Sequence, residues 1–438
     1  MNLFWKSLLG KITPAEILEK REEELVIAMK RYEEVTKSIE LEEFKKLFHE
    51  VKAAAFIENK KTLQNRKYKD TEEYRAWTRF NKLHHSPKLK VYYKVLHSAE
   101  LKSFLAFEKT PDYEKLGDKK EVAASETFQK QKAFEKSLDY KIYCRFHESF
   151  VIKEYEELKK KVESEDFKKN NSFWANAHRW HTTPEYKKEQ RFYELAKNPD
   201  IEFYNNEKPE RFEAYKKQKI EFEDTFNWNS LSKSSWNFGF HYKSTDAIVN
   251  HSFTNEKQAN NSGKNIQVRD GILTISTKKE TVTARAWDQT KGFVMQQFDY
   301  TSDVLQTGLE FRQRGGVFMA KIRCSGNVNH AFWLGADGKL PHINIFHFDG
   351  KKIRVGNAYN EIFDGAKISG INPAQFYIYT LKWSKNELVW MINDVEVHRT
   401  TANIPKEEMF LVFNSFIPQK SHVSEGSLEI DWVRVYKN

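Results

Sequence analysis

The sequence of 438 residues predicts a chain of two unlike halves. The first, residues 1–220, is expected to be an all-α helical array or bundle, and the second, residues 221–438, an antiparallel β-sandwich of the jelly-roll type. The chain is too long for one compact core. From Thr13 to about Lys219 it is rich in Glu, Lys, Ala, Leu, Phe and Tyr and poor in glycine, which favours helices. Beyond Phe226 short apolar alternations are separated by turn residues, which indicates strands.

The helical half carries several helix starts. The run Thr13-Pro14-Ala15-Glu16 combines a capping hydroxyl, a proline in the first turn and an acid that can contact the cap. Similar starts stand at Thr110-Pro111, Thr183-Pro184 and Ser86-Pro87. Each of them predicts the N-terminus of a helix.

Three segments of this half resemble one another. They begin at Ser86, Ser137 and Thr183, about fifty residues apart, and each places aromatic and aliphatic residues among Lys and Glu after a capping hydroxyl. A helix pair cannot bury an aromatic stripe alone, whereas stacked pairs share a continuous core. The pattern therefore predicts helix-pair repeats in an elongated array, and an irregular bundle fits it equally well. Either arrangement would serve as a spacer, a scaffold or an arm that binds a protein partner.

Composition bears on partners and location. The net charge of +10 comes from interspersed Lys and Glu rather than from a basic block, so no nucleic-acid partner is expected. No apolar run approaches the roughly 18 to 20 residues that would cross a bilayer, so no transmembrane segment is expected. Residues 1–11 have helical apolar spacing, interrupted by Lys6, and no small-residue cleavage site follows. They predict a short amphipathic helix rather than a signal peptide, and hence a cytoplasmic protein or a part of a larger assembly.

Cysteines and histidines of the chain do not suggest cross-links or metals. Cys144 and Cys324 fall in different halves, so reduced thiols are expected rather than a disulfide. His84 and His85 are adjacent and would point in different directions on a helix, which makes them a poor chelate. We expect no metal and no cofactor.

The second half alternates between apolar and polar residues in short runs. Residues 271–277, 316–323, 377–383 and 428–436 all show this period of two, and three Asp-Gly pairs mark turns between such runs. Many short strands over about 210 residues indicate a two-sheet sandwich or jelly roll.

Several of these strands carry a more specific resemblance. The blocks occur in one order along the chain and comprise residues 268–275, 315–323, 331–335, 376–383 with 388–397, and 428–436. Together they resemble glycoside hydrolase family 16, the laminarinase and endo-glucanase family with the concanavalin A-like lectin/glucanase sandwich. The resemblance covers about half of the chain and implies that fold for residues 221–438.

The strand at residues 340–348 departs from the family's pattern. The family carries three acids there. The first is a Glu, the second is an Asp two positions later with Ile between them, and the third is a Glu three positions after the Asp. In this chain the nucleophile position is His342, the intervening acid is replaced by Asn344, and the acid/base position is His347. Retaining hydrolysis needs one carboxylate that attacks the anomeric carbon and a second, about 5 Å away, that protonates the leaving oxygen. A histidine could act as a general acid, but it is a poor substitute for a carboxylate that forms a glycosyl ester.

We therefore expect a degenerate, non-catalytic site that binds a polysaccharide or glycan, or a sandwich used as an interaction module. Alternation places 342 and 344 on one face, and the extra residue before 347 suggests a bulge that returns this side chain to the same face. Ring and amide groups can stack on sugars and hydrogen-bond to them. Trp333 and Asn414 are further ligand-binding candidates by resemblance, alongside His342, Asn344 and His347, and for Trp333 packing in the core is the favoured alternative.

Three alternatives remain open at the level of sequence. The first is an active glycoside hydrolase of the endo-glucanase type that uses displaced acids, for which Glu310, Asp337, Asp349 and Glu361 are candidates. The second is a metal site on His342 and His347, which offers fewer ligands than zinc normally has. The third is a purely structural component of a larger assembly, with the helical half as stalk and the sandwich as head.

Overall fold

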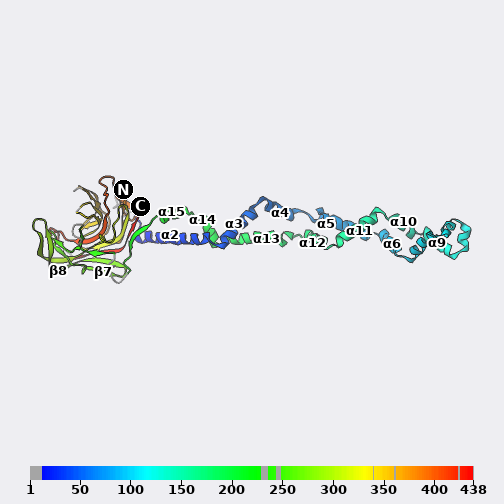
Figure 1. Ribbon diagram of the computed structural model, residues 1–438, viewed down its shortest axis with the longest axis horizontal. Helices are drawn as coiled ribbons and strands as arrows, with labels where there is room; N and C mark the ends of the chain where they lie inside the picture. The colour runs from blue at the N-terminus through cyan, green and yellow to red at the C-terminus, as the bar shows by residue number, and fades with distance from the viewer. Residues whose placement is uncertain are drawn as a thin grey trace. The chain divides into compact units, whose positions relative to one another are not determined.

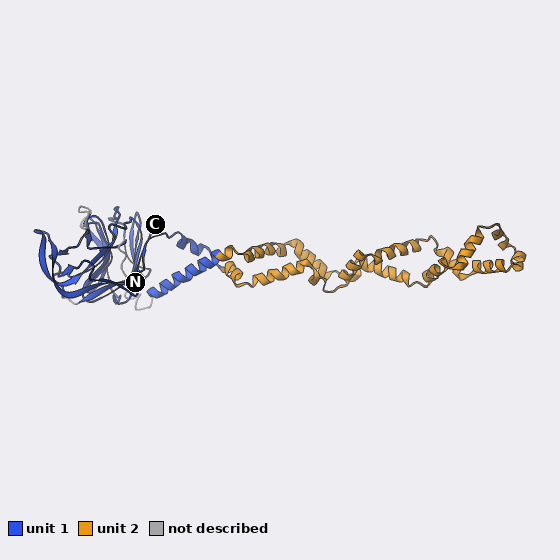
Figure 2. Cartoon of the chain, turned by 60° about the horizontal axis from the view of Figure 1, so that its bottom comes forward, with its two compact units in different colours: residues 1–33, 207–438 blue, residues 34–206 orange. Residues whose placement is uncertain are grey.

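The computed structural model describes residues 12–227, 235–242, 248–338, 340–359, 362–422 and 425–437. The helix expected over residues 1–11 lies outside these ranges. The chain forms two compact units, drawn in two colours in Figure 2: one comprises residues 1–33 and 207–438, and the other residues 34–206. The sandwich unit thus also includes segments on the N-terminal side of residue 220, where the sequence placed the domain boundary.

Helices make up the first half of the chain, as the sequence predicted (Figure 1). The α-helices are α2 (Ala15–Thr36), α3 (Ile39–Lys52), α4 (Ala54–Asn65), α5 (Glu72–His84), α6 (Pro87–Leu96), α7 (Ala99–Glu108), α8 (Lys119–Ala124), α9 (Glu126–Lys136), α10 (Leu138–Phe146), α11 (Phe150–Glu163), α12 (Glu165–Ala175), α13 (Pro184–Ala196), α14 (Pro199–Asn206) and α15 (Glu210–Lys216). Short 3₁₀ helices lie at η1 (Tyr68–Asp70), η2 (Pro111–Gly117) and η3 (Arg179–Thr182). Among the described residues, no helix is both long and apolar enough to cross a membrane.

Hydroxyl caps explain why so many short helices begin where they do. In each case the side-chain oxygen of a Ser or Thr accepts a hydrogen bond from a backbone N–H in the first turn, which satisfies a donor that the helix leaves free. These caps are Ser38, Thr71, Ser98, Ser125, Ser137, Ser149, Ser164 and Thr183. Of the predicted starts, Thr110-Pro111 differs, because it opens the 3₁₀ helix η2 instead of an α-helix.

Within residues 34–206 several helices pair with helices that are far away in the sequence, and others, such as α8 and α9, contact their sequence neighbours. Helix α3 packs on α13, α5 on α11 and α6 on α10. Each pair is closed by two nearly parallel rings: Phe44 and Phe192 at 5.4 Å, Phe80 and Tyr155 at 5.7 Å, and Tyr92 and Tyr143 at 6.0 Å between centroids. The apolar side chains gather in separate clusters along the unit rather than in one core, which is the arrangement of an array. Whether the three similar segments are repeats stays a prediction.

Strands make up the second half. They are β1 (Ile220–Asp224), β2 (Asn237–Phe238), β3 (Phe240–His241), β4 (Ile248–Val249), β5 (Ser252–Phe253), β6 (Gln258–Asn260), β7 (Ile266–Arg269), β8 (Ile272–Asp288), β9 (Gly292–Ser302), β10 (Val304–Gln306), β11 (Gly316–Ser325), β12 (Asn329–Gly335), β13 (His342–Asp349), β14 (Ile353–Tyr359), β15 (Ile362–Ile368), β16 (Tyr377–Trp383), β17 (Leu388–Ile392), β18 (Val395–Thr400), β19 (Phe410–Phe416) and β20 (Gly426–Tyr436).

In the described part of the chain these strands form two large sheets and a small two-stranded one, β3 with β4. An eleven-stranded sheet has the order β18-β17-β16-β11-β20-β8-β9-β6, with β1, β5 and β7 paired beside this path, and a seven-stranded sheet has the order β15-β14-β13-β12-β19-β10-β2. The pairings are antiparallel except for two short parallel ones, β5 with β8 and β6 with β9. The predicted antiparallel sandwich is therefore confirmed, with a small parallel element.

The core lies between the two sheets. Phe318 and Leu381 come from the eleven-stranded sheet and meet Phe332 and Phe413 of the seven-stranded sheet, all of them without solvent exposure. The rings of Phe332 and Phe413 stack at 4.5 Å between centroids. Because alternate residues fill this core, the residues between them form the outer faces of the sheets.

The beginning of α2 covers part of the outer face of the eleven-stranded sheet. Ala15 is buried against Ile378 of β16 and Trp432 of β20. Both carboxylate oxygens of Glu19 accept hydrogen bonds from the Lys321 ammonium, at 2.8 and 3.1 Å. This helix is therefore a structural part of the sandwich unit.

Candidate functional site

Strand β13 places three polar side chains on the outer face of the seven-stranded sheet. Asn344 pairs with Gly356 on β14 and His347 with Arg354, so β13 has one residue more than its neighbour over this stretch. The two residues between Asn344 and His347 both face the core. This β-bulge returns His347 to the face that carries His342 and Asn344, as the sequence predicted.

The bulge is tied to the opposite sheet by a buried hydrogen bond. The indole N–H of Trp390 on β17 donates to the backbone carbonyl of Asn344 at 2.8 Å. Trp390 has no solvent exposure. A bulge disrupts the hydrogen-bond ladder locally, and a buried carbonyl without a partner is costly.

Replacing Trp390 with phenylalanine is therefore expected to destabilise the sandwich by about 1 to 3 kcal/mol, because the Asn344 carbonyl loses its donor. The measurement is the free energy of unfolding in urea. An unchanged unfolding midpoint would show that this contact does not hold the bulge.

Five side chains on strands β12, β13 and β19 form what we call the imidazole face: Trp333, His342, Asn344, His347 and Asn414. The rings of Trp333 and His342 stack at 4.3 Å between centroids, with an angle of 14° between their planes. Nε2 of His342 lies 2.8 Å from the Asn344 side-chain oxygen, and the Trp333 indole N–H donates to the Asn414 side-chain oxygen at 3.0 Å. All five residues that the sequence singled out for ligand binding are thus brought together.

The hydrogen bond to Asn344 determines which ring nitrogen of His342 carries a hydrogen. Because an amide oxygen only accepts, Nε2 of His342 carries the hydrogen and donates it. Burial lowers the pKa of His342, and the bond to Asn344 opposes this shift. The ring is therefore a neutral imidazole at neutral pH, held by stacking on one side and by the amide on the other.

His347 lies at the other end of the face. Its Nε2 is 3.5 Å from the side-chain nitrogen of Asn329, and its ring is 5.7 Å from that of Phe416. Burial lowers the pKa of His347 to about 4, and nearby His342 acts in the same direction. At neutral pH His347 is thus also uncharged.

Two of the displaced acids named for an active hydrolase, Asp337 and Asp349, lie at opposite ends of strand β12. Asp349 pairs with Asn329 at one end of β12, whereas Asp337 follows Gly335 at the other end. Asn329 and Gly335 are six residue steps apart along the strand, which corresponds to roughly 20 Å. That separation exceeds the roughly 5 to 9.5 Å between the carboxyl groups of glycosidases.

Each of these acids has its own surroundings. Asp349 accepts from the Arg354 guanidinium at 2.7 Å and from two backbone N–H groups; burial would raise its pKa, but these hydrogen bonds hold it below the usual range. Asp337 forms an ion pair with Arg312 at 2.6 Å. Glu310 is exposed. Glu361 lies outside the described residues.

Over the part of the chain that the structure describes, no group of three or more His, Cys, Asp and Glu side chains is arranged to hold a metal ion. Cys144 is exposed and Cys324 is buried, and both are free thiols. Burial raises the pKa of Cys324 to about 12, so it remains a neutral thiol.

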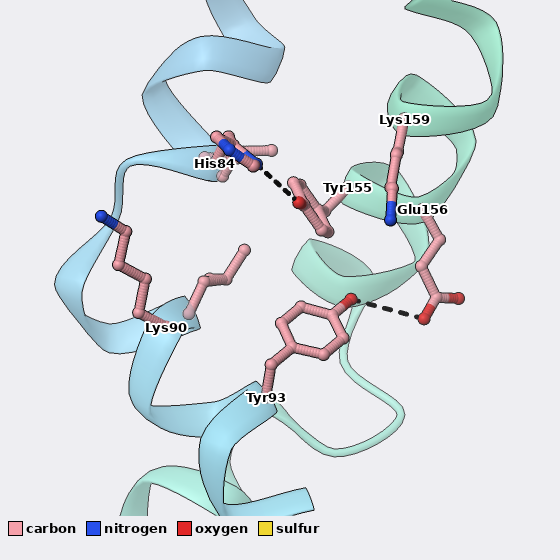
Figure 3. A pocket seen from close by; sticks show the side chains of 8 residues that line it. His84, Lys90, Tyr93, Tyr155, Glu156 and Lys159 are labelled. Atoms are coloured by element: carbon pink, nitrogen blue, oxygen red, sulfur yellow. Dashed lines mark hydrogen bonds between the residues drawn. The ribbon is translucent and has the colours of Figure 1, made fainter. Parts of the chain in front are cut away.

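The helical unit contains a separate cavity of about 410 Å³ (Figure 3). His84 and Tyr155 meet across it with 2.9 Å between Nδ1 and the hydroxyl, and the Tyr93 hydroxyl donates to Glu156 at 3.4 Å. Burial, aided by the Glu156 carboxylate, raises the pKa of Tyr93 to about 12. These polar groups bind one another, which gives His84 a structural role.

Two residues near the imidazole face were missed by the sequence reading. Asn329 lies on β12 in phase with Trp333, four residues on, so strand alternation could have found it. Phe363 of β15 also lies on this side of the sheet, but no local pattern distinguishes it from an ordinary strand residue.

Comparisons with known proteins agree with the resemblance. Residues 253–434 match the family model described as "Glycosyl hydrolases family 16". A relative from Rhizobium meliloti (strain 1021), "Endo-1,3-1,4-beta-glycanase EglC", is 24% identical over 195 residues, which cover 40% of this chain and 40% of that protein. The chain therefore spans less than half the length of this curated relative.

Solved structures that resemble the chain include the catalytic domain of an endo-1,3-beta-glucanase (laminarinase) from Thermotoga petrophila RKU-1, at 18% identity and a TM-score of 0.41, over 50% of this chain and 98% of that one. A laminarinase from Flavobacterium sp. UMI-01 gives 19% identity and a TM-score of 0.40, over 50% and 100% of the two chains. The helical residues lie outside the family match. The C-terminal region of this chain, residues 253–434, thus matches glycosyl hydrolases family 16.

Proposed function

We propose that the sandwich is a non-catalytic, carbohydrate-binding relative of the family 16 hydrolases, a pseudoenzyme that holds a β-glucan-like chain on its imidazole face. The ligand class follows from the proteins that the chain resembles, which are named as an endo-1,3-1,4-β-glycanase and as laminarinases. The observation that carries the proposal is the locked, neutral network of Trp333, His342 and Asn344 on strand β13 and its neighbour.

This network is poorly suited to hydrolysis. Double displacement needs a carboxylate nucleophile and a carboxylic acid close together. His342 already donates to Asn344 and stacks on Trp333, and His347 remains unprotonated until the pH approaches 4. Neither imidazole is therefore a charged nucleophile or a ready proton donor at neutral pH.

The same groups suit the binding of a sugar. A pyranose has an apolar ring face and a rim of hydroxyl groups, which match an aromatic ring and amide side chains respectively. Trp333, His342 and Asn344 are all partly exposed, so they are accessible from solvent. Binding through uncharged groups predicts weak dependence on salt.

Replacing Trp333 with alanine in the full chain is expected to weaken binding to laminarin at least tenfold, because an aromatic anchor is removed. Trp287 provides the matched control: it is a 39% exposed tryptophan of the same unit, on β8, away from the imidazole face. Its alanine variant is expected to bind within about twofold of the wild type, since it lacks such a contact. Affinity electrophoresis in laminarin gels measures both.

Release of reducing ends from laminarin is measured in parallel on the wild type. Sustained turnover would overturn the non-catalytic proposal in favour of a hydrolase with displaced acids. Equal losses for the Trp333 and Trp287 variants would overturn the assignment of the site. Circular dichroism confirms that each variant is folded.

We further propose that the helical unit binds a protein partner, as part of a larger assembly. Large apolar side chains there are strongly exposed, among them Ile39 at 79%, Leu138 at 72% and Phe150 at 78%. Polar substitution of these three residues is expected to leave laminarin binding unchanged. The effect of these substitutions is measured as the amount of a cross-linked partner that co-purifies with the chain. The partner is identified by mass spectrometry, and the complex is then reconstituted from pure components.

A further inference from the structure

The imidazole face continues across two more strands of the seven-stranded sheet. On β14, Ala358 pairs with His342 and Gly356 pairs with Asn344. On β15, Phe363 pairs with Ala358 and Gly365 pairs with Gly356. Directly paired residues of antiparallel strands share a face. Beside His342 and Asn344 the sheet therefore carries small residues, followed by an aromatic one.

Phe363 lies over this strip of small residues. Its ring atoms come within 2.7 Å of the positions that a Cβ would occupy on Gly356 and on Gly365. The ring thus lies against the backbone on the side of Asn344. Backbone oxygens already lie 2.5 Å and 2.3 Å from those Cβ positions, so the close approach of the strands also requires the two glycines.

The Phe363 side chain is nevertheless 52% exposed, although it belongs to a sheet whose inner face is fully packed. Exposed single apolar residues are ordinary on a protein surface. The position of Phe363 is less ordinary, because it borders the polar centre of the imidazole face opposite Trp333. The face presents, in order, an indole, an imidazole with an amide, and a phenyl ring.

We propose that Phe363 is a second stacking platform for the bound glycan, so that the face takes an oligosaccharide rather than a single sugar. This inference rests on the function proposed above. Trp333 on β12 and Phe363 on β15 are three strand spacings apart, which corresponds to about 14 Å. A chain of linked pyranoses reaches from one ring to the other, while its hydroxyl groups meet His342 and Asn344 between them.

The residues between Trp333 and Phe363 are uncharged, which favours a sugar over an acidic or basic peptide at this position; Lys367 of β15 lies on the same face, beside Arg354. Arg354 and Asp349, the charged groups next to His347, pair with each other at 2.7 Å. Aromatic rings that flank amide groups match the alternating apolar faces and hydroxyl rims of a glucan. A second copy of the chain, docked on the same ring through the edge strand β15, is the competing occupant, and the experiment distinguishes it.

The experiment measures binding of laminarihexaose and laminaribiose to the full chain by calorimetry. Replacing Phe363 with alanine is expected to weaken laminarihexaose binding about tenfold, since an aromatic contact is lost, and to leave laminaribiose binding at Trp333 within about twofold. Replacing Phe363 with tyrosine should restore the affinity. Met295→Ala removes another exposed apolar side chain, 68% exposed on β9, and serves as the control without effect.

The outcomes separate the two proposals. Wild-type protein that binds neither ligand overturns both. Wild-type protein that binds laminarihexaose equally well with and without Phe363 overturns the second platform and leaves the proposed function standing. An equal loss for both ligands also overturns it, because Phe363 would then support the fold of the whole face. Loss of a dimer in the Phe363 variant, seen by ultracentrifugation, without loss of glucan affinity assigns the ring to a second copy instead.

Discussion

The protein is expected to lose stability between pH 7 and pH 4, and replacing His347 with glutamine is expected to make this loss smaller by about 2 kcal/mol. His347 titrates at about 4 in the folded chain, whereas an unperturbed histidine titrates near 6.5. Below pH 6.5 the unfolded state therefore binds a proton that the folded state rejects. The stabilising contribution of this histidine is complete above pH 6.5 and is lost as the pH falls to 4.

The magnitude follows from the size of the shift. A full displacement from 6.5 to about 4 corresponds to about 3 kcal/mol, and the partial exposure of the ring reduces this to about 2 kcal/mol. His330 contributes in the same direction, because burial lowers its pKa to about 4 as well. Around His347, His342 and Arg354 further disfavour the charged form, and Asp349 opposes them. Glutamine keeps a polar group opposite Asn329 and removes only the titration.

Glu256 supplies a control with the opposite sign. Burial raises the pKa of its carboxyl to about 7, against a hydrogen bond from Gln258 that lowers it. Its folded state therefore holds a proton that the unfolded state has released, and its contribution to stability grows as the pH falls from 7 to 4.5. Glu256→Gln should steepen the acid-induced loss of stability, whereas His347→Gln should flatten it.

Urea unfolding at half-unit steps between pH 7 and pH 4 provides the test. Parallel profiles for wild type and His347→Gln would mean that the imidazole titrates in the folded protein as it does in the unfolded chain. In that case burial would not be what keeps the His347 ring neutral.

Local sequence signals were sufficient for much of this architecture. Capping hydroxyls such as Ser137 and Thr183 begin helices where they were expected, because a cap acts on its own first turn. The period of two in the strands predicted the shared face of His342 and Asn344, and one extra residue predicted the bulge before His347. These features depend on neighbours in sequence.

Features that depend on distant residues were not predictable in the same way. The pairing of α6 with α10 is one example, since two similar amphipathic helices do not specify their partners. Phe363 is another example, because its position on the imidazole face follows from its register with Ala358 and His342. The residues of β15 alone do not predict the order of β13, β14 and β15 in the sheet. The boundary at residue 220 was predicted from composition, which changes there. Contacts nevertheless join the beginning of α2 to the sandwich, and composition does not reveal them.

That junction leads to the other large expected effect. Glu19→Ala on α2 is expected to destabilise the sandwich unit by about 2 to 3 kcal/mol, because it removes one partner of a nearly buried cation. The Lys321 side chain is 9% exposed and is held between Glu19 at 2.8 Å and Asp431 at 2.7 Å. Glu19 also accepts from the indole N–H of Trp432 at 2.6 Å. Without Glu19, the ammonium retains a single carboxylate partner and the indole loses its acceptor.

Glu24→Ala is the matched control on the same helix. Glu24 lies 4.0 Å from Lys20, and both side chains are more than 60% exposed, so this pair contributes no more than about 0.5 kcal/mol. Amide hydrogen exchange in β11 and β20 reads the effect where it arises, because these strands carry Lys321 and Trp432. Faster exchange is expected for Glu19→Ala and not for Glu24→Ala.

A fragment that begins at residue 221 should show the same weakness in a stronger form. It lacks Glu19 and also Ala15, whose burial covers Ile378 and Trp432. It further loses Glu22, which lies 3.1 Å from the Arg434 guanidinium. Uncovered apolar surface and an unbalanced Lys321 together are expected to cost several kcal/mol, so binding measurements need the chain with α2 present. Equal exchange rates in β11 and β20 for the fragment and the full chain would show that α2 rests on the sheet without stabilising it.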